Sequence, residues 1–112
     1  EIGVRLVGSE MCIETVRALL TGDPHQLAPL LINDLQAPAI SLMPSLRQTL
    51  LAAKEAGALA AIVSGSGPSI AMLCADEAAA VDVATGVSVS GKASATILTT
   101  SPATGARLRG TP

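Results

Sequence analysis

Apolar residues recur at helical spacing near the start of the chain. Residues 9–20 place Ile13, Val16 and Leu20 on one face, with serine before the first turn and glycine after the last. This pattern predicts an amphipathic helix over residues 9–20. The preceding residues 2–7 form either a short edge strand or an extended connection.

Prolines divide the next segment. Asp23 and Pro24 match an N-cap followed by the first helical residue. Pro29 cannot lie inside an uninterrupted helix, because it lacks the N–H group and clashes with the preceding turn. We therefore expect a short turn and a short helix within residues 24–37, with Pro38 as a further interruption.

A stronger helix is predicted over residues 44–57. A proline opens it, which is favourable in the first turn. Leu46, Leu50 and Ala53 fall on one face, and Gly57 is placed to end the helix.

The hydrophobic pattern then changes from helix to strand. Residues 58–63 and 69–75 are short, continuous apolar runs bounded by glycine, serine and aspartate, which predicts two strands buried against helices. A second amphipathic helix is predicted over residues 76–84, with Asp76 as its cap and Gly86 as its end.

The remaining residues predict a loop and two more strands. Residues 86–93 form a loop, residues 94–100 (SATILTT) a strand, residues 101–105 a turn and residues 106–109 a final strand. This order is an α+β layout, in which helices pack on a small, mostly antiparallel sheet. The sequence has no internal repeat, and we expect a single domain over residues 1–112.

The composition excludes one large class of partner. Hydrophobic residues make up 49% of the chain and charged residues only 14%, so most of it should pack. It contains no Phe, Tyr or Trp, so no nucleobase can stack on an aromatic ring. Because the net charge is −2 as well, we expect no nucleic-acid partner.

The apolar runs are short. The longest, residues 58–63 and 70–75, fall far below the roughly 20 residues of a membrane span, so we expect no membrane partner. No basic and apolar leader is present, and Cys12 and Cys74 lie in apolar stretches, so we expect reduced thiols and a cytoplasmic location. The chain begins at Glu1 rather than Met, and we expect it to be a piece of a longer protein.

Residues that could carry chemistry are sparse. His25, the single histidine, has no Ser or Cys at a spacing that indicates a nucleophile pair, so we expect an exposed polar residue. Two isolated cysteines, one histidine and scattered carboxylates match no zinc spacing. We therefore expect no metal site and no catalytic residue in this chain.

The pair Asn33-Asp34 interrupts an apolar stretch. Short polar side chains often bond neighbouring backbone, so a local cap or an exposed edge is the favoured interpretation. The alternative is that the pair braces a loop or a ligand.

Residues 64–69, SGSGPS, separate the two predicted strands. A Walker A loop needs a lysine and then Ser or Thr at the start of a helix, whereas Pro68, Ser69 and a strand follow here. Lys54 and Lys92 flank the loop without belonging to it. The glycines still allow positive φ and the close approach of another backbone or an anion. These residues alone favour a tight connection over a ligand site.

Three segments together resemble the GHMP kinases. Residues 57–69, from GA to VSGSGPS before an apolar strand, resemble the third motif of that superfamily. GDPHQLAPLLINDLQAPAISLMPSLRQTL, residues 22–50, resembles the stretch before that motif in its isoprenoid-pathway branch. TSPATGARL, residues 100–108, looks like the closing strands of the same enzymes. The resemblance spans residues 9–109.

The resemblance implies that this chain is the ferredoxin-like C-terminal domain of a two-domain kinase. The N-terminal kinase domain would hold the main phosphate loop and the catalytic residues. The full-length enzyme would use ATP and Mg²⁺ on a small-molecule substrate, whereas the fragment alone would bind neither and be inactive. The residues that would line the interdomain cleft, and the pair that would support them, are Gly65, Ser66, Gly67 and Pro68, and Asn33 and Asp34.

Two other hypotheses remain open. One is a GHMP kinase with a different acceptor, and the other is a free-standing α+β module that binds a small ligand in regulation. In the kinase hypothesis, the apolar face left without its N-terminal domain would make the fragment prone to self-association.

Overall fold

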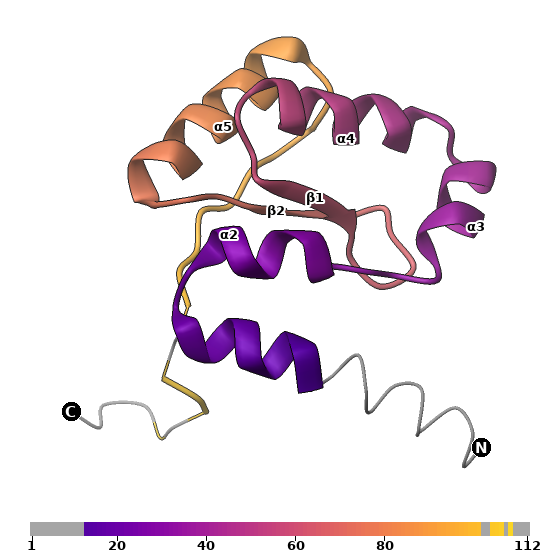
Figure 1. The fold of residues 1–112 in the computed structure, drawn as a ribbon. Coiled ribbons are helices and arrows are strands. Elements are labelled where there is room, and N and C mark those ends of the chain that lie inside the picture. Colours follow the sequence, from indigo (N-terminus) through magenta and orange to yellow (C-terminus); the bar gives the residue numbers. More distant parts are fainter. Residues whose placement is uncertain (1–12, 102–103, 107, 109–112) are drawn as a thin grey trace.

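The structure is a computed structural model that describes residues 13–101, 104–106 and 108. Its elements are a helix at residues 13–21, α2 (Pro24–Leu27), η1 (Ala28–Leu30), α3 (Gln36–Leu42), α4 (Ser45–Glu55), β1 (Ala60–Val63), β2 (Ile70–Leu73) and α5 (Glu77–Ser90). α4 and α5 lie on one side of the β1–β2 hairpin, while α2 and the helix of residues 13–21 lie on the other (Figure 1). The expected α+β class is confirmed.

The first predicted helix is confirmed over the part that the structure describes. Residues 13–21 are helical, while the expected cap at Ser9 and the segment 2–7 lie outside the described residues. Asp23 caps α2 as predicted, because its carboxylate accepts the His25 N–H at 2.9 Å. That bond lowers the pKa of the Asp23 carboxyl below its usual value.

The segment after α2 folds differently from the prediction. An extended connection follows η1, and α3 starts only at Gln36 and continues through Pro38. A proline is tolerated in the first turn because the N–H groups there have no partner within the helix. The prediction that Pro38 interrupts this segment is therefore wrong.

The two later helices are confirmed, with one correction. Asp76 caps α5 by accepting a backbone N–H of the first turn at 2.7 Å. The helix does not end at Gly86, however, but continues to Ser90 and ends at Gly91, whose φ is 72°. A Cβ atom added at Gly86 would lie 2.9 Å from the Cβ of Ala56, which follows α4. This glycine therefore allows close contact between α4 and α5 and does not end the helix.

The two central strands are confirmed, and they pair antiparallel over their whole length. The strand predicted over residues 94–100 is wrong, since these residues are exposed and form no strand. Residues with a high β-propensity form a strand only when a neighbour supplies backbone partners, and no described segment does so there. The strand predicted over residues 106–109 falls partly outside the described residues, and its described positions form no strand.

Among the described residues, buried side chains form two small apolar clusters between the hairpin and its helices. They are Ala39, Leu46 and Val63, and Ala53, Val83 and Val87. Leu46 and Ala53 point inward from α4 as predicted. Because the chain has no aromatic residue, such small side chains reach the packing density of a protein interior only if the backbones approach closely.

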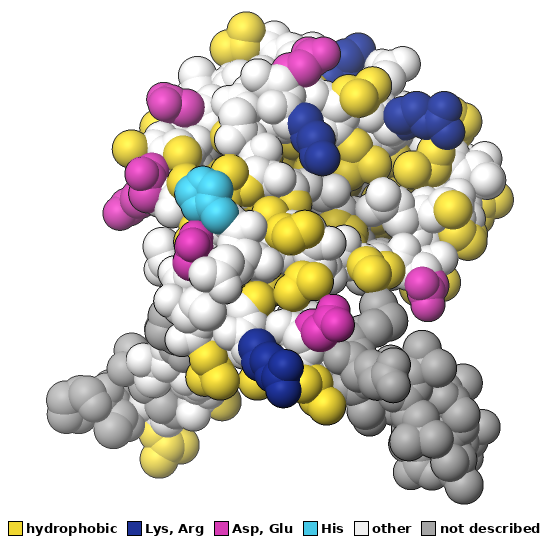
Figure 2. All heavy atoms as spheres, viewed as in Figure 1, with side chains coloured by type: hydrophobic (Ala, Val, Ile, Leu, Met, Phe, Trp, Pro, Cys, Tyr) yellow, Lys and Arg dark blue, Asp and Glu magenta, His cyan; other side chains and the backbone are white. Residues whose placement is uncertain are grey.

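The helix of residues 13–21 does not bury its apolar face. Ile13 and Val16 are each 51% exposed and Leu20 is 82% exposed, although Ala18 on the same helix is buried. Figure 2 shows apolar side chains open to solvent on the face viewed in Figure 1. None of the helices in the described part combines the length and apolar content that crossing a bilayer requires.

Gly86→Ala should destabilise the chain by about 1–3 kcal/mol, because the added methyl group meets Ala56 and forces α4 and α5 apart. Alanine is intrinsically better in a helix by about 1 kcal/mol, which opposes this effect without cancelling it. Urea unfolding followed by circular dichroism measures the difference.

The matched control is Ala56→Gly, which removes the methyl group on the other side of the contact. If the contact causes the loss, A56G/G86A should be more stable than the sum of the two single changes implies. A gain in stability from Gly86→Ala alone would show that the two helices have room for the methyl group.

Candidate functional site

The loop of residues 64–69, the glycine loop, connects β1 to β2 at the turn end of the hairpin. Its base is closed by the Ser64 N–H, which donates to the Ser69 carbonyl at 2.8 Å, and the Gly67 N–H donates to the Ser64 carbonyl at 3.0 Å. The peptide bond between Gly67 and Pro68 is cis. Every residue of the loop except Gly67 is exposed. The sequence motif therefore lies on the surface, where another domain or a ligand can reach it.

The two loop glycines serve different purposes. Gly65 has a φ of 57°, and no atom lies within 4 Å of a Cβ placed on it. Gly67 has a φ of 81°, and a Cβ there would lie 3.3 Å from Val63 Cγ1 and 3.7 Å from Leu46 Cδ1. Gly65 thus lets the backbone turn where no other atom is close. Gly67 lets the loop backbone pack closely against the side chains of Val63 and Leu46.

Two side-chain amides hold the start of the loop. Asn33 Nδ2 donates to the carbonyls of Val63 at 2.7 Å and Gly65 at 2.8 Å. The Asn33 side chain is held in turn, because its Oδ1 accepts the Leu35 N–H at 3.1 Å. Gln36 Oε1 accepts the Val63 N–H at 2.9 Å. The structure therefore brings Asn33 to the loop.

Gln36 was not among the residues singled out from the sequence. The available signal was its place three residues after Asn33, at the first position of α3. A polar residue at the start of a helix is usually interpreted as a cap. That interpretation gives no reason to expect a bond to a strand far along the chain, such as the one that Gln36 forms with Val63.

The loop offers backbone N–H donors but has no charged side chain. Within the described residues, the N–H groups of Gly65 and Ser66 donate to no protein atom. The loop contains no charged residue, and the Lys92 ammonium donates to Gln48 Oε1 on α4 at 2.9 Å. Free N–H groups beside positive-φ glycines can bind an anion or another backbone.

The structure places the other candidate residues as follows. Asp34 is exposed, and its carboxylate forms no hydrogen bond within the part of the chain that the structure describes. His25 is exposed as well, and its Nδ1 lies 3.1 Å from Asp23 Oδ1 at the start of α2. No three His, Cys, Asp or Glu side chains among the described residues are grouped as a metal site requires.

Cys74 is a free, half-buried thiol at the end of β2. Burial raises the pKa of this thiol, and the negative charge of Asp76 raises it further. The thiol therefore stays protonated near neutral pH, which makes it a poor nucleophile. Cys12 lies outside the described residues.

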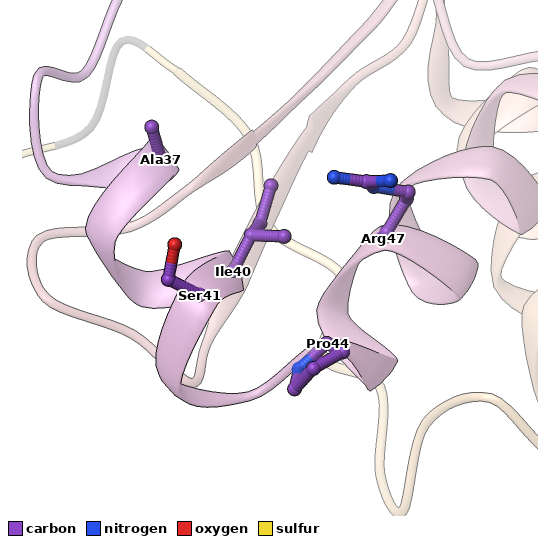
Figure 3. Close-up of a pocket in the computed structure, with 5 residues that line it drawn as sticks. All are labelled: Ala37, Ile40, Ser41, Pro44 and Arg47. Carbon is purple, nitrogen blue, oxygen red and sulfur yellow. The ribbon is translucent and has the colours of Figure 1, made fainter.

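An open depression of about 440 Å³ lies between α3 and α4 (Figure 3). Its lining residues are Ala37, Ile40, Ser41, Pro44 and Arg47. It contains one cation and no acid–base pair, and no residue of the loop lines it. The glycine loop is therefore the stronger candidate site.

The fold and this loop define a known class of domain. Residues 15–93 match the family model described as GHMP kinases C terminal, so the chain belongs to this family. The resemblance predicted from the sequence is confirmed.

The curated relatives are more specific. The chain is 67% identical over 91 residues to the 4-diphosphocytidyl-2-C-methyl-D-erythritol kinase of Corynebacterium jeikeium, covering 81% of this chain and 25% of the relative. It is 56% identical to the kinase of the same name from Mycobacterium avium, covering 81% and 29%. It is 54% identical to the kinase of the same name from Nocardia farcinica, covering 83% of this chain and 30% of the relative. The chain thus spans 25–30% of the length of these relatives.

Gly67→Ala should destabilise the chain more than Gly65→Ala does. Positive φ costs an L-residue about 1–2 kcal/mol at either position. Only at Gly67 would the new methyl group also press on Val63 and Leu46, which adds about 1 kcal/mol or more. Urea unfolding of both variants makes the comparison, with Gly65→Ala as the control for backbone strain. Equal losses would show that Gly67 does not seat the loop on the core.

Proposed function

We propose that this chain is the C-terminal domain of an ATP-dependent kinase. The whole protein would transfer the γ-phosphate to the 2-hydroxyl of 4-diphosphocytidyl-2-C-methyl-D-erythritol, in the non-mevalonate isoprenoid pathway of the cytoplasm. The three relatives reported above, which carry this name, are 54–67% identical to the chain, and this supports the choice of acceptor. The domain family supports the class of reaction.

The exposed loop, with the Gly65 and Ser66 N–H groups open to a ligand, is the observation that carries this proposal. In such an enzyme, Gly65, Ser66, Gly67 and Pro68 would line the cleft between the domains, where N–H groups can contact phosphate oxygens. Asn33 would support the loop through its bonds to Val63 and Gly65. No hydrogen bond of the described residues supports the same role for Asp34, whose carboxylate is exposed.

The N-terminal domain would supply the charged groups. Phosphoryl transfer depends on cations that neutralise the phosphate oxygens and on a group that orients the acceptor. The loop has no charged residue, and the described residues hold no cluster of three metal ligands. The Mg²⁺ ligands, the phosphate-binding lysine and the acid–base residues would therefore lie on the other domain.

A chimaera tests the activity directly. If residues 15–93 of this chain replace the matching stretch of the C. jeikeium kinase, the product should phosphorylate the named acceptor at a rate within about tenfold of the parent enzyme. The 112-residue chain alone should release no ADP above background, because its loop carries no charged residue and the catalytic groups would lie on the other domain. Phosphorus NMR of the product and an ADP-release assay provide the measurements.

The parent kinase and the same enzyme without the matching stretch are the two controls. A chimaera that folds but is inactive would contradict the proposal. Turnover by the 112-residue chain alone would contradict the assignment of the chemistry to the other domain.

The proposed N-terminal domain also accounts for the exposed apolar face. Ile13, Val16, Leu19 and Leu20, all on the helix of residues 13–21, are at least half exposed. Without a domain to cover them, they should make the isolated chain associate with itself. Small-angle scattering should show a mass that rises with concentration, and V16K/L20E should lower it. A monomeric profile of the unmodified chain at high concentration would count against this partner surface.

A further inference from the structure

The outer edge of β1 ends at Val63, and no strand among the described residues lies beside it. The Ser64 N–H faces the partner strand, where it bonds Ser69, so alternation along the strand turns the N–H and carbonyl of Val63 away from β2. Both outward groups are nevertheless bonded, the N–H to Gln36 and the carbonyl to Asn33. The two amide side chains take the place of a strand at this single residue.

Asn33 also determines which way one loop peptide points. Its second bond goes to the Gly65 carbonyl, at 2.8 Å. The peptide bond between Gly65 and Ser66 is trans, so its N–H points opposite to its carbonyl. Because the carbonyl is directed at Asn33, the Ser66 N–H is directed away from it. Ser66 is exposed, and this N–H donates to no protein atom within the described residues.

We propose that Asn33 and Gln36 are positioning residues for the glycine loop. Together they fix the Val63 and Gly65 peptides, so that the Ser66 N–H and not the Gly65 carbonyl faces an incoming phosphate oxygen. A flipped peptide would present a carbonyl oxygen, which repels an anion. The identity of the ligand rests on the proposed function, whereas the orientation of the peptide does not.

The two amides act through opposite chemistry. Asn33 is a donor to two carbonyls. Asn33→Asp would replace the donating NH₂ group with a carboxylate oxygen, which repels both carbonyl oxygens. Gln36 works as an acceptor, so Gln36→Glu keeps the atom that bonds Val63, whereas Gln36→Met removes it. Nearly isosteric changes at the two positions should therefore have different outcomes.

NMR of the full 112-residue chain tests the orientation without any activity. In an aligned sample, the dipolar coupling of the Ser66 N–H should agree with the structure for the unmodified chain and disagree for Asn33→Asp. Exchange of the Val63 N–H should be about tenfold faster in Gln36→Met, because one hydrogen bond is lost. Gln36→Glu should recover most of that protection.

Kinetics of the chimaera test the role in binding. Asn33→Asp should lower kcat/KM for ATP by about tenfold to a hundredfold, as expected when one donor to a phosphate oxygen is misdirected. Gln36→Met should show a smaller loss, and Gln36→Glu should recover most of it. Val83→Ala, a truncation in the other core cluster, should lower the melting temperature and leave kcat/KM unchanged.

The results separate this inference from the proposed function. If the chimaera is inactive, the proposed function fails, while NMR still decides whether Asn33 orients the peptide. If the chimaera is active and Asn33→Asp behaves like Val83→Ala in kcat/KM, the positioning role is wrong. An unchanged Ser66 dipolar coupling in Asn33→Asp would overturn it as well. If Asn33→Asp does not fold, Gln36→Met and Gln36→Glu decide, and equal exchange of the Val63 N–H in both would overturn the inference.

Discussion

Val63 is the residue at which the sheet, the core and the glycine loop meet. Its side chain is 1% exposed and packs with Ala39 and Leu46, while its outward peptide groups bond Asn33 and Gln36. A shift of the strand by one residue would turn this side chain to the other face of the sheet and break both amide bonds. Apolar packing and polar bonding therefore fix the same register, and the position of the loop follows from it.

The chain holds the loop in a fixed conformation but supplies little charge to it. Neutral amides and backbone groups hold the loop, so its conformation does not depend on the titration of any side chain in these contacts. Backbone N–H groups are useful to a phosphate only if they already point at it, since they carry no net charge that could attract it from a distance. Such a loop fits the proposed kinase, in which this domain would complete a cleft whose cations lie on the other domain.

Several features could be predicted from the sequence because they depend on neighbouring residues. Asp23 and Asp76 cap their helices through bonds to residues two and three positions away. The predictions that Gly86 ends a helix and that residues 94–100 form a strand were wrong, because both features depend on contacts with distant segments. The first packs against Ala56 in another helix, and the second has β-propensity but no partner in the described part of the chain.

The sequence by itself determined the α+β class, the family and the position of the glycine loop, because periodicity, caps and motif spacing are local properties. It also drew attention to Asn33, with a local cap and a loop brace as alternatives. Only the tertiary structure decided that the Asn33 amide reaches the Val63 carbonyl, 30 residues away in the chain, and that Gln36 accepts from the N–H of the same residue. A side-chain amide has the same local preferences wherever it occurs, so its partner is decided only when the folded chain brings a distant backbone group within 3 Å of it.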